Sequence, residues 1–232
     1  MIKAVIFDLD DTLCDYAGAK RKGLAAAAGA IAAPDQSLEE FVGRYFAAEP
    51  ELFRSFADGQ ITLDVYRHRR FSEAAGRPLT DMELSRANVL YMDHANGGAE
   101  LFPDVLRTLS TLADRGLVLA LLTNGPSDGQ RTKLEATGLL KVFEHIFISE
   151  EIGAAKPSIQ AFQRVAGYLG LSVSDCLMVG DALDIDVRGA QAAGMEAMLL
   201  ARSGDAERDE WTISTLDDLP AKLAPTGQRR GR

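Results

Sequence analysis

The sequence contains few cysteines, no long apolar run and no excess of positive charge, and each shortage excludes a class of protein. Only Cys14 and Cys176 are present, too few for a disulfide framework and consistent with a reducing compartment. No apolar stretch approaches the ~20 residues that a membrane-spanning helix needs. The formal net charge of -9 disfavours binding to nucleic acid or to an anionic membrane. Because acidic residues interrupt the first apolar run, no secretory signal is expected, and we predict a cytoplasmic protein.

Length and composition fit an ordinary globular chain. With 232 residues, 47% hydrophobic and 25% charged, the chain can bury a core of useful size. This length suits one large domain, or one domain with a smaller second one.

Strand-like and helix-like segments alternate over most of the chain. Five short apolar runs predict buried strands, at residues 3–7, 117–122, 145–149, 176–179 and 196–200. Helical patterns separate them, at residues 101–116, 127–138, 158–170 and 183–193. Ser127 is placed to cap the second of these helices, and Ile159, Phe162 and Val165 share one face of the third. This order predicts an α/β fold with a doubly wound, Rossmann-like parallel sheet.

Residues 15–100 break this alternation. They hold no convincing run of buried strands, and an alanine-rich stretch near their start favours helix. Ser37 with Glu40, and Thr80 with Glu83, have the spacing of N-terminal capping boxes. We therefore predict a small all-helical domain that is inserted after the first strand.

The predicted domain organisation follows from these two patterns. Residues 1–14 and 101–226 are expected to form the α/β core domain, and residues 15–100 the helical domain. The polar and basic end of the chain, residues 227–232, is expected to be a disordered tail.

Polar side chains follow four of the predicted core segments. In an open parallel sheet, ligands bind where the strands end at their carboxyl side. If the sheet forms as predicted, four segments deliver polar groups to one edge: Asp8 and Asp10, Thr123 and Asn124, Gly180 and Asp181, and Lys156.

The acidic residues at this edge indicate a bound cation. Asp8 and Asp10 lie two apart, so on an extended chain their carboxylates point the same way and repel each other. Asp181 adds a third acid, and Asp186 follows within about one helical turn. Oxygen-rich clusters of this kind suit Mg²⁺. Any one of these acids alone would be read as a turn or helix-cap residue, since aspartate is common at both places.

Three further residues fit a phosphate site. Thr123 and Asn124, with nearby backbone N–H groups, could cradle a phosphate at a helix N-terminus, or could simply form a turn and cap. Lys156 alone would be read as a surface lysine. Beside three acids and an anion, it can hold the acids in position and neutralise phosphate charge.

The motifs "DLDDT", "TNG", "KP" and "GDALDID", in this order, resemble the four signature motifs of the haloacid dehalogenase-like hydrolase superfamily. The resemblance covers nearly the whole chain, including a helical cap after the first motif. The stretches "YAGAKRKG" and "TNGPSDGQRTKLEATGL" further resemble the branch that contains N-acylneuraminate-9-phosphatase and related nucleotidases.

The resemblance implies a role for each matched position. It makes Asp8 the nucleophile that forms an aspartyl-phosphate and Asp10 the general acid and base. Mg²⁺ would be the cofactor, bound by Asp8, the backbone carbonyl of Asp10 and Asp181, with Asp186 supporting these ligands. The phosphoryl oxygens would be bound by Thr123, Asn124 and Lys156. The expected activity is hydrolysis of a small phosphorylated metabolite, such as a sugar phosphate or a nucleoside monophosphate.

Four alternatives stay open. The dehalogenases of the superfamily lack an acid two residues after the nucleophile, so Asp10 favours a phosphatase. The phosphonate-cleaving branch forms a Schiff base on a cap lysine, for which Lys20 and Lys22 are candidates. A phospho-acceptor signalling module shares the acids, threonine and lysine, but needs no inserted domain. A binding protein on a retired enzyme fold would be expected to have lost part of the motif set.

Substrate choice is expected to lie in the helical domain. Lys20 and Arg21 come soon after the first motif, and we predict that they affect substrate specificity. The other basic candidates there are read as solvated helix faces: Arg44, Arg67, His68 and Arg69. We expect a small phosphorylated metabolite as the partner, no nucleic acid and no membrane, and a monomer or homodimer.

Overall fold

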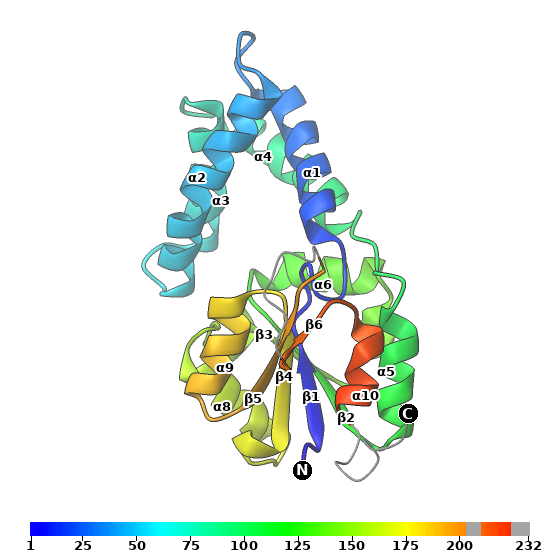
Figure 1. Cartoon of the computed structure of the whole chain (residues 1–232). Helices are drawn as coiled ribbons and strands as arrows, with labels where there is room; N and C mark the ends of the chain where they lie inside the picture. Colours follow the sequence, from blue (N-terminus) through cyan, green and yellow to red (C-terminus); the bar gives the residue numbers. More distant parts are fainter. Residues whose placement is uncertain (203–209, 224–232) are drawn as a thin grey trace. The chain divides into compact units, whose positions relative to one another are not determined.

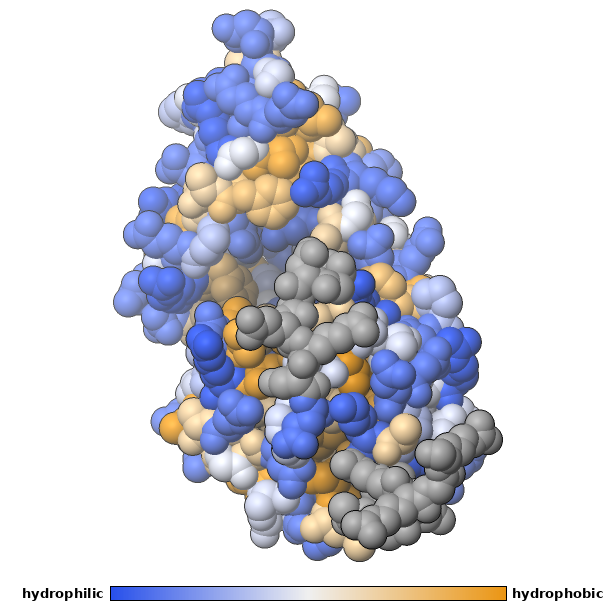
Figure 2. All heavy atoms as spheres, in the orientation of Figure 1, coloured by the Kyte–Doolittle hydropathy of each residue, from blue (hydrophilic) through white to orange (hydrophobic). Residues whose placement is uncertain are grey.

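The computed structural model describes residues 1–202 and 210–223. Contacts divide the chain into two compact units. The α/β unit consists of Met1–Cys14, Leu101–Asn124 and Leu140–Arg232. The helical unit consists of Asp15–Glu100 and Gly125–Leu139. Figure 2 shows hydrophilic side chains over most of the visible face of each unit, and smaller apolar areas are interspersed among these side chains.

A six-stranded parallel sheet forms the centre of the α/β unit (Figure 1). Its strands are β1 (Ala4–Phe7), β2 (Val118–Thr123), β3 (His145–Ile148), β4 (Cys176–Gly180), β5 (Glu196–Leu200) and β6 (Thr212–Ile213). They lie in the order β3-β2-β1-β4-β5-β6, and every adjacent pair is parallel. The predicted fold class and all five predicted strands are confirmed. The sequence interpretation missed β6, which has only two residues.

Helices cover both faces of this sheet. Figure 1 shows α5 (Val105–Asp114) and α10 (Leu219–Lys222) on one side, and α8 (Ile159–Tyr168) and α9 (Arg188–Ala192) on the other. Every residue of β1 is buried, as expected for a central strand covered on both faces. The other short helical elements of the unit are α7 (Ser149–Ile152), η3 (Val173–Asp175), η4 (Leu183–Val187) and η5 (Leu216–Asp218). A further short element, η2 (Leu139–Lys141), has its first residue grouped with the helical unit and the other two with the α/β unit.

Two details of the predicted helices differ in the structure. The predicted face of α8 holds for Phe162 and Val165, which are buried in the core, but Ile159 at the first turn is 43% exposed. The predicted helix at residues 183–193 begins as the π-helical turn η4 and becomes α-helical only at Arg188. Single π-helical turns often occur at functional sites.

The helical unit contains no strand. Its elements are α1 (Tyr16–Ile31), α2 (Leu38–Ala57), α3 (Leu63–Ala75), α4 (Asp81–Tyr91), η1 (Met92–Asn96) and α6 (Ser127–Ala136). Its apolar core includes Leu24, Phe41, Tyr45, Phe71 and Tyr91.

The predicted caps explain where two of these helices begin. The Ser37 side chain accepts a hydrogen bond from the Glu40 N–H at the start of α2. Thr80 and Glu83 form the full reciprocal capping box at the start of α4. Pro126 occupies the N-cap position of α6, so Ser127 is the first helical residue rather than the cap.

Contacts group residues 125–139 with the helical unit, whereas the sequence placed them in the core domain. The domain boundaries proposed from the sequence stay a prediction. The predicted disordered tail, residues 227–232, lies outside the described residues. Among residues 1–202 and 210–223, no helix is both long and apolar enough to cross a bilayer.

Candidate active site

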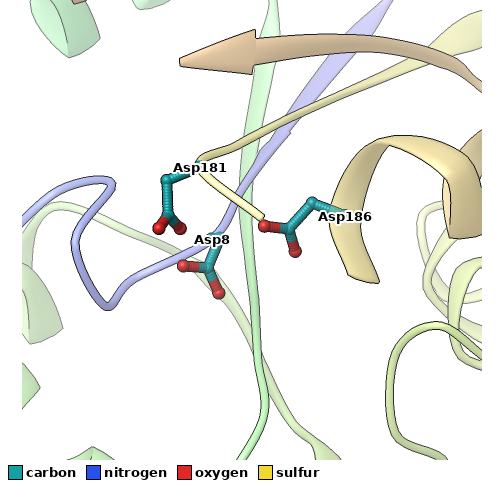
Figure 3. A group of neighbouring side chains, drawn as sticks. All are labelled: Asp8, Asp181 and Asp186. Carbon is teal, nitrogen blue, oxygen red and sulfur yellow. The ribbon is translucent and has the colours of Figure 1, made fainter. Parts of the chain in front are cut away.

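Three aspartates meet at the carboxyl edge of the sheet. Asp8 follows β1, Asp181 follows β4, and Asp186 lies in η4. One carboxylate oxygen of each lies within 4.8 Å of one oxygen of the others. Figure 3 shows the three carboxylates side by side, each from a different segment. The sheet therefore brings together residues that are up to 178 positions apart in the sequence, from Asp8 to Asp186.

Lys156 joins two of these acids. Its ammonium donates hydrogen bonds to Asp8 Oδ1 and to Asp186 Oδ1, both at 2.6 Å. The lysine side chain and that of Asp186 are each 1% exposed, and that of Asp8 is 10% exposed. Burial alone would lower the pKa of Lys156, but the two carboxylates outweigh it and raise the pKa. Lys156 therefore stays charged and holds the two aspartates together.

A glycine and a π-helical turn bring Asp186 into the site. Asp186 Oδ2 accepts a hydrogen bond from the Ala182 N–H at 3.1 Å, and the Asp186 N–H donates to the Ala182 carbonyl at 2.8 Å. A Cβ on Gly180 would lie 2.3 Å from Asp186 Oδ2. Only glycine leaves room for this approach, so Gly180 is required by the packing of Asp186 beside the backbone.

The acidic cluster is short of positive charge. Burial raises the pKa of Asp8 to about 8, and the neighbouring carboxylates Asp186, Asp10 and Asp181 add to the shift, although Lys156 opposes it. Partial loss of solvent and repulsion from Asp186 and Asp11 raise the pKa of Asp181 to about 6, even though this residue keeps an exposed edge. A divalent cation would relieve this repulsion. The clustered carboxylate oxygens are the hard donors that Mg²⁺ prefers, so the residues present fit this ion.

Thr123 and Asn124 end β2 at the same edge of the sheet. The Thr123 hydroxyl is buried and has no hydrogen-bond partner among the described residues. A buried hydroxyl of this kind costs free energy unless a ligand satisfies it. The Asn124 side chain bonds the backbone of Lys156 twice, donating to its carbonyl at 2.8 Å and accepting from its N–H at 2.9 Å. Asn124 therefore positions Lys156, and its predicted contact with phosphate stays a prediction.

The loop after β1 presents Asp10. The Leu9 carbonyl accepts hydrogen bonds from the N–H groups of Leu13 and Cys14, and the Asp11 N–H donates to the Cys14 carbonyl. Asp11 has a φ of 60°, a left-handed conformation that aspartate tolerates better than most residues. Asp11 thus forms the turn, while Asp10 lies half-buried and outside the group of three carboxylates.

The sequence interpretation missed Thr12 and Arg202. The Thr12 hydroxyl donates to Asp181 Oδ1 at 3.2 Å. The Arg202 guanidinium donates to the Thr12 carbonyl at 2.8 Å and makes two bonds, at 3.0 and 3.1 Å, to the carboxylate of Asp104. Asp104 is buried, yet the hydrogen bonds from Arg202, Thr215 and the Leu216 N–H lower its pKa. Arg202 follows β5 by two residues, so it fits the same pattern of polar side chains after the strands as the other site residues.

We expect Arg202→Met to weaken both the fold and the site. It leaves the buried Asp104 carboxylate without its cation, which should cost about 3 kcal/mol of unfolding free energy. It also frees the loop that carries Asp10 and Thr12, so catalytic efficiency should fall roughly tenfold and the Mg²⁺ concentration for half activity should rise. Arg107→Met is the matched control, because Arg107 pairs with Asp217 at an exposed position. Equal effects of the two substitutions on Mg²⁺ dependence would contradict this role for Arg202.

The two predicted specificity residues lie on α1 in the helical unit and differ in environment. The Lys20 ammonium lies over the rings of Tyr45 and Phe46 and forms a long ion pair, 4.0 Å, with Glu49. Arg21 is exposed on the helix surface. An effect of either residue on specificity stays a prediction, and the surroundings of Lys20 favour it over Arg21.

Comparison with known proteins identifies the family. Residues 2–194 match the model of the haloacid dehalogenase-like hydrolases, and the chain belongs to this family. It is 34% identical over 205 residues to the glyceraldehyde 3-phosphate phosphatase of Methanopyrus kandleri, covering 87% of this chain and 85% of the relative. It is 27% identical over 249 residues to the mouse (Mus musculus) N-acylneuraminate-9-phosphatase, covering 96% of this chain and 94% of the relative.

Solved structures agree with this assignment. The HAD hydrolase YfnB of Bacillus subtilis, in a crystal form bound to magnesium, superposes with a TM-score of 0.75 at 25% identity, covering 96% of this chain and 98% of that one. A 2-haloacid dehalogenase from Pseudomonas syringae superposes with a TM-score of 0.71 at 28% identity, with the same coverage. The chain is therefore a hydrolase, and its curated relatives place it with the phosphatases of the family.

Proposed function

We propose that this enzyme hydrolyses small phosphomonoesters in a Mg²⁺-dependent reaction that passes through an aspartyl-phosphate on Asp8. The observation that carries the proposal is the bridge from Lys156 to Asp8 and Asp186, with Asp181 beside them and Asp10 two residues after the nucleophile. This arrangement holds one carboxylate next to a fixed ammonium, and it supplies a second acid that can move a proton.

The first chemical step transfers the phosphoryl group to the enzyme. A carboxylate oxygen of Asp8 forms a bond to phosphorus while the bond from phosphorus to the ester oxygen breaks. Protonated Asp10 gives its proton to the departing alkoxide, which leaves as an alcohol. Asp8 must be ionised to attack, and Lys156 favours this form by donating to Asp8 Oδ1.

The second step releases phosphate. Asp10, now ionised, takes a proton from a water molecule whose oxygen bonds to phosphorus, and the bond from phosphorus to Asp8 breaks. Asp8 is regenerated as a carboxylate and Asp10 as an acid, so the cycle is balanced. The Lys156 ammonium neutralises phosphoryl charge, and the unsatisfied Thr123 hydroxyl can donate to a phosphoryl oxygen.

A bound Mg²⁺ would be held by Asp8, Asp181 and the backbone carbonyl of Asp10, with Asp186 supporting this set. It would supply charge neutralisation, which lowers the repulsion between the Asp8 carboxylate and an anionic substrate. Treatment with EDTA should therefore reduce turnover of a phosphomonoester by roughly a hundredfold or more, and added Mg²⁺ should restore it. A turnover rate that is unchanged after thorough chelation would reject the metal.

The substrate is proposed to be a sugar phosphate or a nucleoside monophosphate. The names of the two curated relatives refer to phosphorylated carbohydrates, which favours the sugar phosphates. The most informative experiment is a screen of the purified protein, with Mg²⁺, against a panel of phosphorylated metabolites. The same preparation shows by sedimentation whether the protein is a monomer or homodimer, as predicted.

Dehalogenase chemistry is the second candidate, because a 2-haloacid dehalogenase has a similar structure. A single turnover in ¹⁸O-labelled water separates the two reactions. Phosphatase chemistry places the label in the released phosphate, because water attacks phosphorus. Dehalogenation forms an ester on Asp8 that water attacks at the carboxyl carbon, so the label enters Asp8. The same experiment tests a signalling role, in which a phosphorylated Asp8 would persist without turnover.

A further inference from the structure

Arg70, on α3 in the helical unit, is buried, and no carboxylate among residues 1–202 and 210–223 pairs with it. Only 5% of the surface of Arg70 is exposed. The two terminal nitrogens lie 3.4 Å from the Tyr45 hydroxyl and from Asn88 Oδ1, which are long contacts, and the Nε has no hydrogen-bond partner in the described part of the chain. Within the part of the chain that the structure describes, Arg70 forms no ion pair. Buried charges in proteins are normally paired, so the N–H donors of this guanidinium can still bind an acceptor.

Aromatic rings surround Arg70 instead. Its Cζ lies between 4.7 and 6.0 Å from the centroids of four rings, those of Tyr45, Tyr66, Phe71 and Tyr91. Cation–π contacts offset part of the cost of burying the charge. They supply no acceptor for the N–H groups in the guanidinium plane, so an anionic oxygen would still find donors there.

Lys20 places a second cation beside the same cluster. Its ammonium lies 5.5 Å from the centroid of the Tyr45 ring, which thus has a cation from α1 and another from α3 within contact range. The Lys20 and Glu49 side chains are 16% and 20% exposed, and Phe46 is 40% exposed. This edge of the cluster therefore meets solvent.

We propose that the helical unit binds an anionic group, a carboxylate or a phosphate, between Arg70 and Lys20 beside Tyr45. A guanidinium binds planar or tetrahedral oxyanions through two parallel N–H donors, and an ammonium adds a point charge. A pairing anion would also satisfy the buried donors that the fold leaves open.

The same anionic group could come from either of two molecules. It is either a second charged group on the phosphorylated substrate or a separate small anion that regulates the enzyme. The first source rests on the proposed phosphatase function, whereas the anion site itself does not. Binding and kinetics therefore need separate measurements.

Binding is tested by thermal unfolding of the full chain with and without malonate, in the absence of Mg²⁺. Malonate should raise the melting temperature of the wild type and of Arg69→Met, the exposed neighbour on the same helix. It should not stabilise Arg70→Met, which should itself melt no lower than the wild type because an unpaired buried charge is gone. Lys20→Met provides a second test if Arg70→Met fails to fold, with malonate affinity lowered about tenfold. Equal malonate stabilisation in all variants would overturn the proposal.

The source is tested with 3-phosphoglycerate and glycerol 3-phosphate, which differ by one carboxylate. If the substrate supplies the anion, the wild type prefers the carboxylate by about tenfold or more in kcat/KM, and Arg70→Met removes this preference. If a separate anion binds, the wild type shows no preference, but malonate changes its hydrolysis of glycerol 3-phosphate and leaves Arg70→Met unaffected. A wild type that hydrolyses p-nitrophenyl phosphate but shows neither of these two patterns would overturn a role of the site in the reaction. Hydrolysis of p-nitrophenyl phosphate by the same variants reports the phosphatase activity independently.

Discussion

Asp8→Asn is expected to lower phosphomonoester turnover by roughly a thousandfold or more while the protein stays folded. An amide oxygen is a poor nucleophile, so the covalent step loses its attacking group. The fold should tolerate the change, because the substitution keeps the side-chain shape and removes one of the crowded carboxylates beside Asp186 and Asp181. Steady-state kinetics and circular dichroism on the same preparation measure both effects.

Asp11→Asn is the matched control for this experiment. It makes the same chemical change in the same loop, and asparagine tolerates the left-handed backbone that Asp11 adopts. Its turnover should stay within about threefold of the wild type, since Asp11 forms the turn and lies outside the three-carboxylate group. Comparable losses in the two variants would mean that the loop, rather than the Asp8 nucleophile, limits activity.

Lys156→Met is expected to be the most destabilising single change at the site. It leaves the buried carboxylates of Asp8 and Asp186 without the ammonium that both contact at 2.6 Å. Removing one partner of a buried ion pair typically costs about 3–5 kcal/mol, so urea unfolding without Mg²⁺ should show a loss of this size. Activity should fall as well, because phosphoryl charge is no longer neutralised.

The control is Lys3→Met, which removes a lysine whose partner is also an aspartate. Lys3 pairs with Asp175 at 2.9 Å, but its side chain is 59% exposed, so the cost should stay below about 1 kcal/mol. Added Mg²⁺ should recover part of the stability of Lys156→Met and little of that of Lys3→Met. Similar unfolding free energies for the two variants would show that Lys156 is not the charge that holds the acids together.

The sequence predicted the fold and most of the site because both depend on local patterns. Apolar runs such as residues 3–7 end in polar side chains, and a parallel sheet brings such ends to one edge. The grouping of Asp8, Lys156 and Asp181 at one edge therefore follows from the strand ends, whereas the role of each residue was implied by the resemblance to the hydrolase superfamily. The caps Ser37 and Thr80 could be predicted because a capping box depends on only four consecutive residues.

Other features depend on contacts between distant segments, which no local pattern records. Arg202 reaches the Thr12 carbonyl across 190 positions. The burial of Arg70 depends on two other helices, α2 with Tyr45 and α4 with Tyr91, and its place on α3 looks like an ordinary solvated position in the sequence. The π-helical turn at Leu183–Val187 cannot be predicted from the sequence, because over five residues its periodicity differs little from that of an α-helix.

The central claim, that Asp8 carries a phosphoryl group during turnover, is tested most directly by mass spectrometry on Asp10→Asn. p-Nitrophenyl phosphate has a leaving group that needs no protonation, so the first step should proceed, while the second step lacks its base. After incubation with Mg²⁺ and an acid quench, we predict one phosphoryl group on the peptide that contains Asp8, and about one nitrophenolate released per chain in the initial burst. An unmodified peptide with no burst, in a preparation whose wild-type protein turns over, would contradict the account.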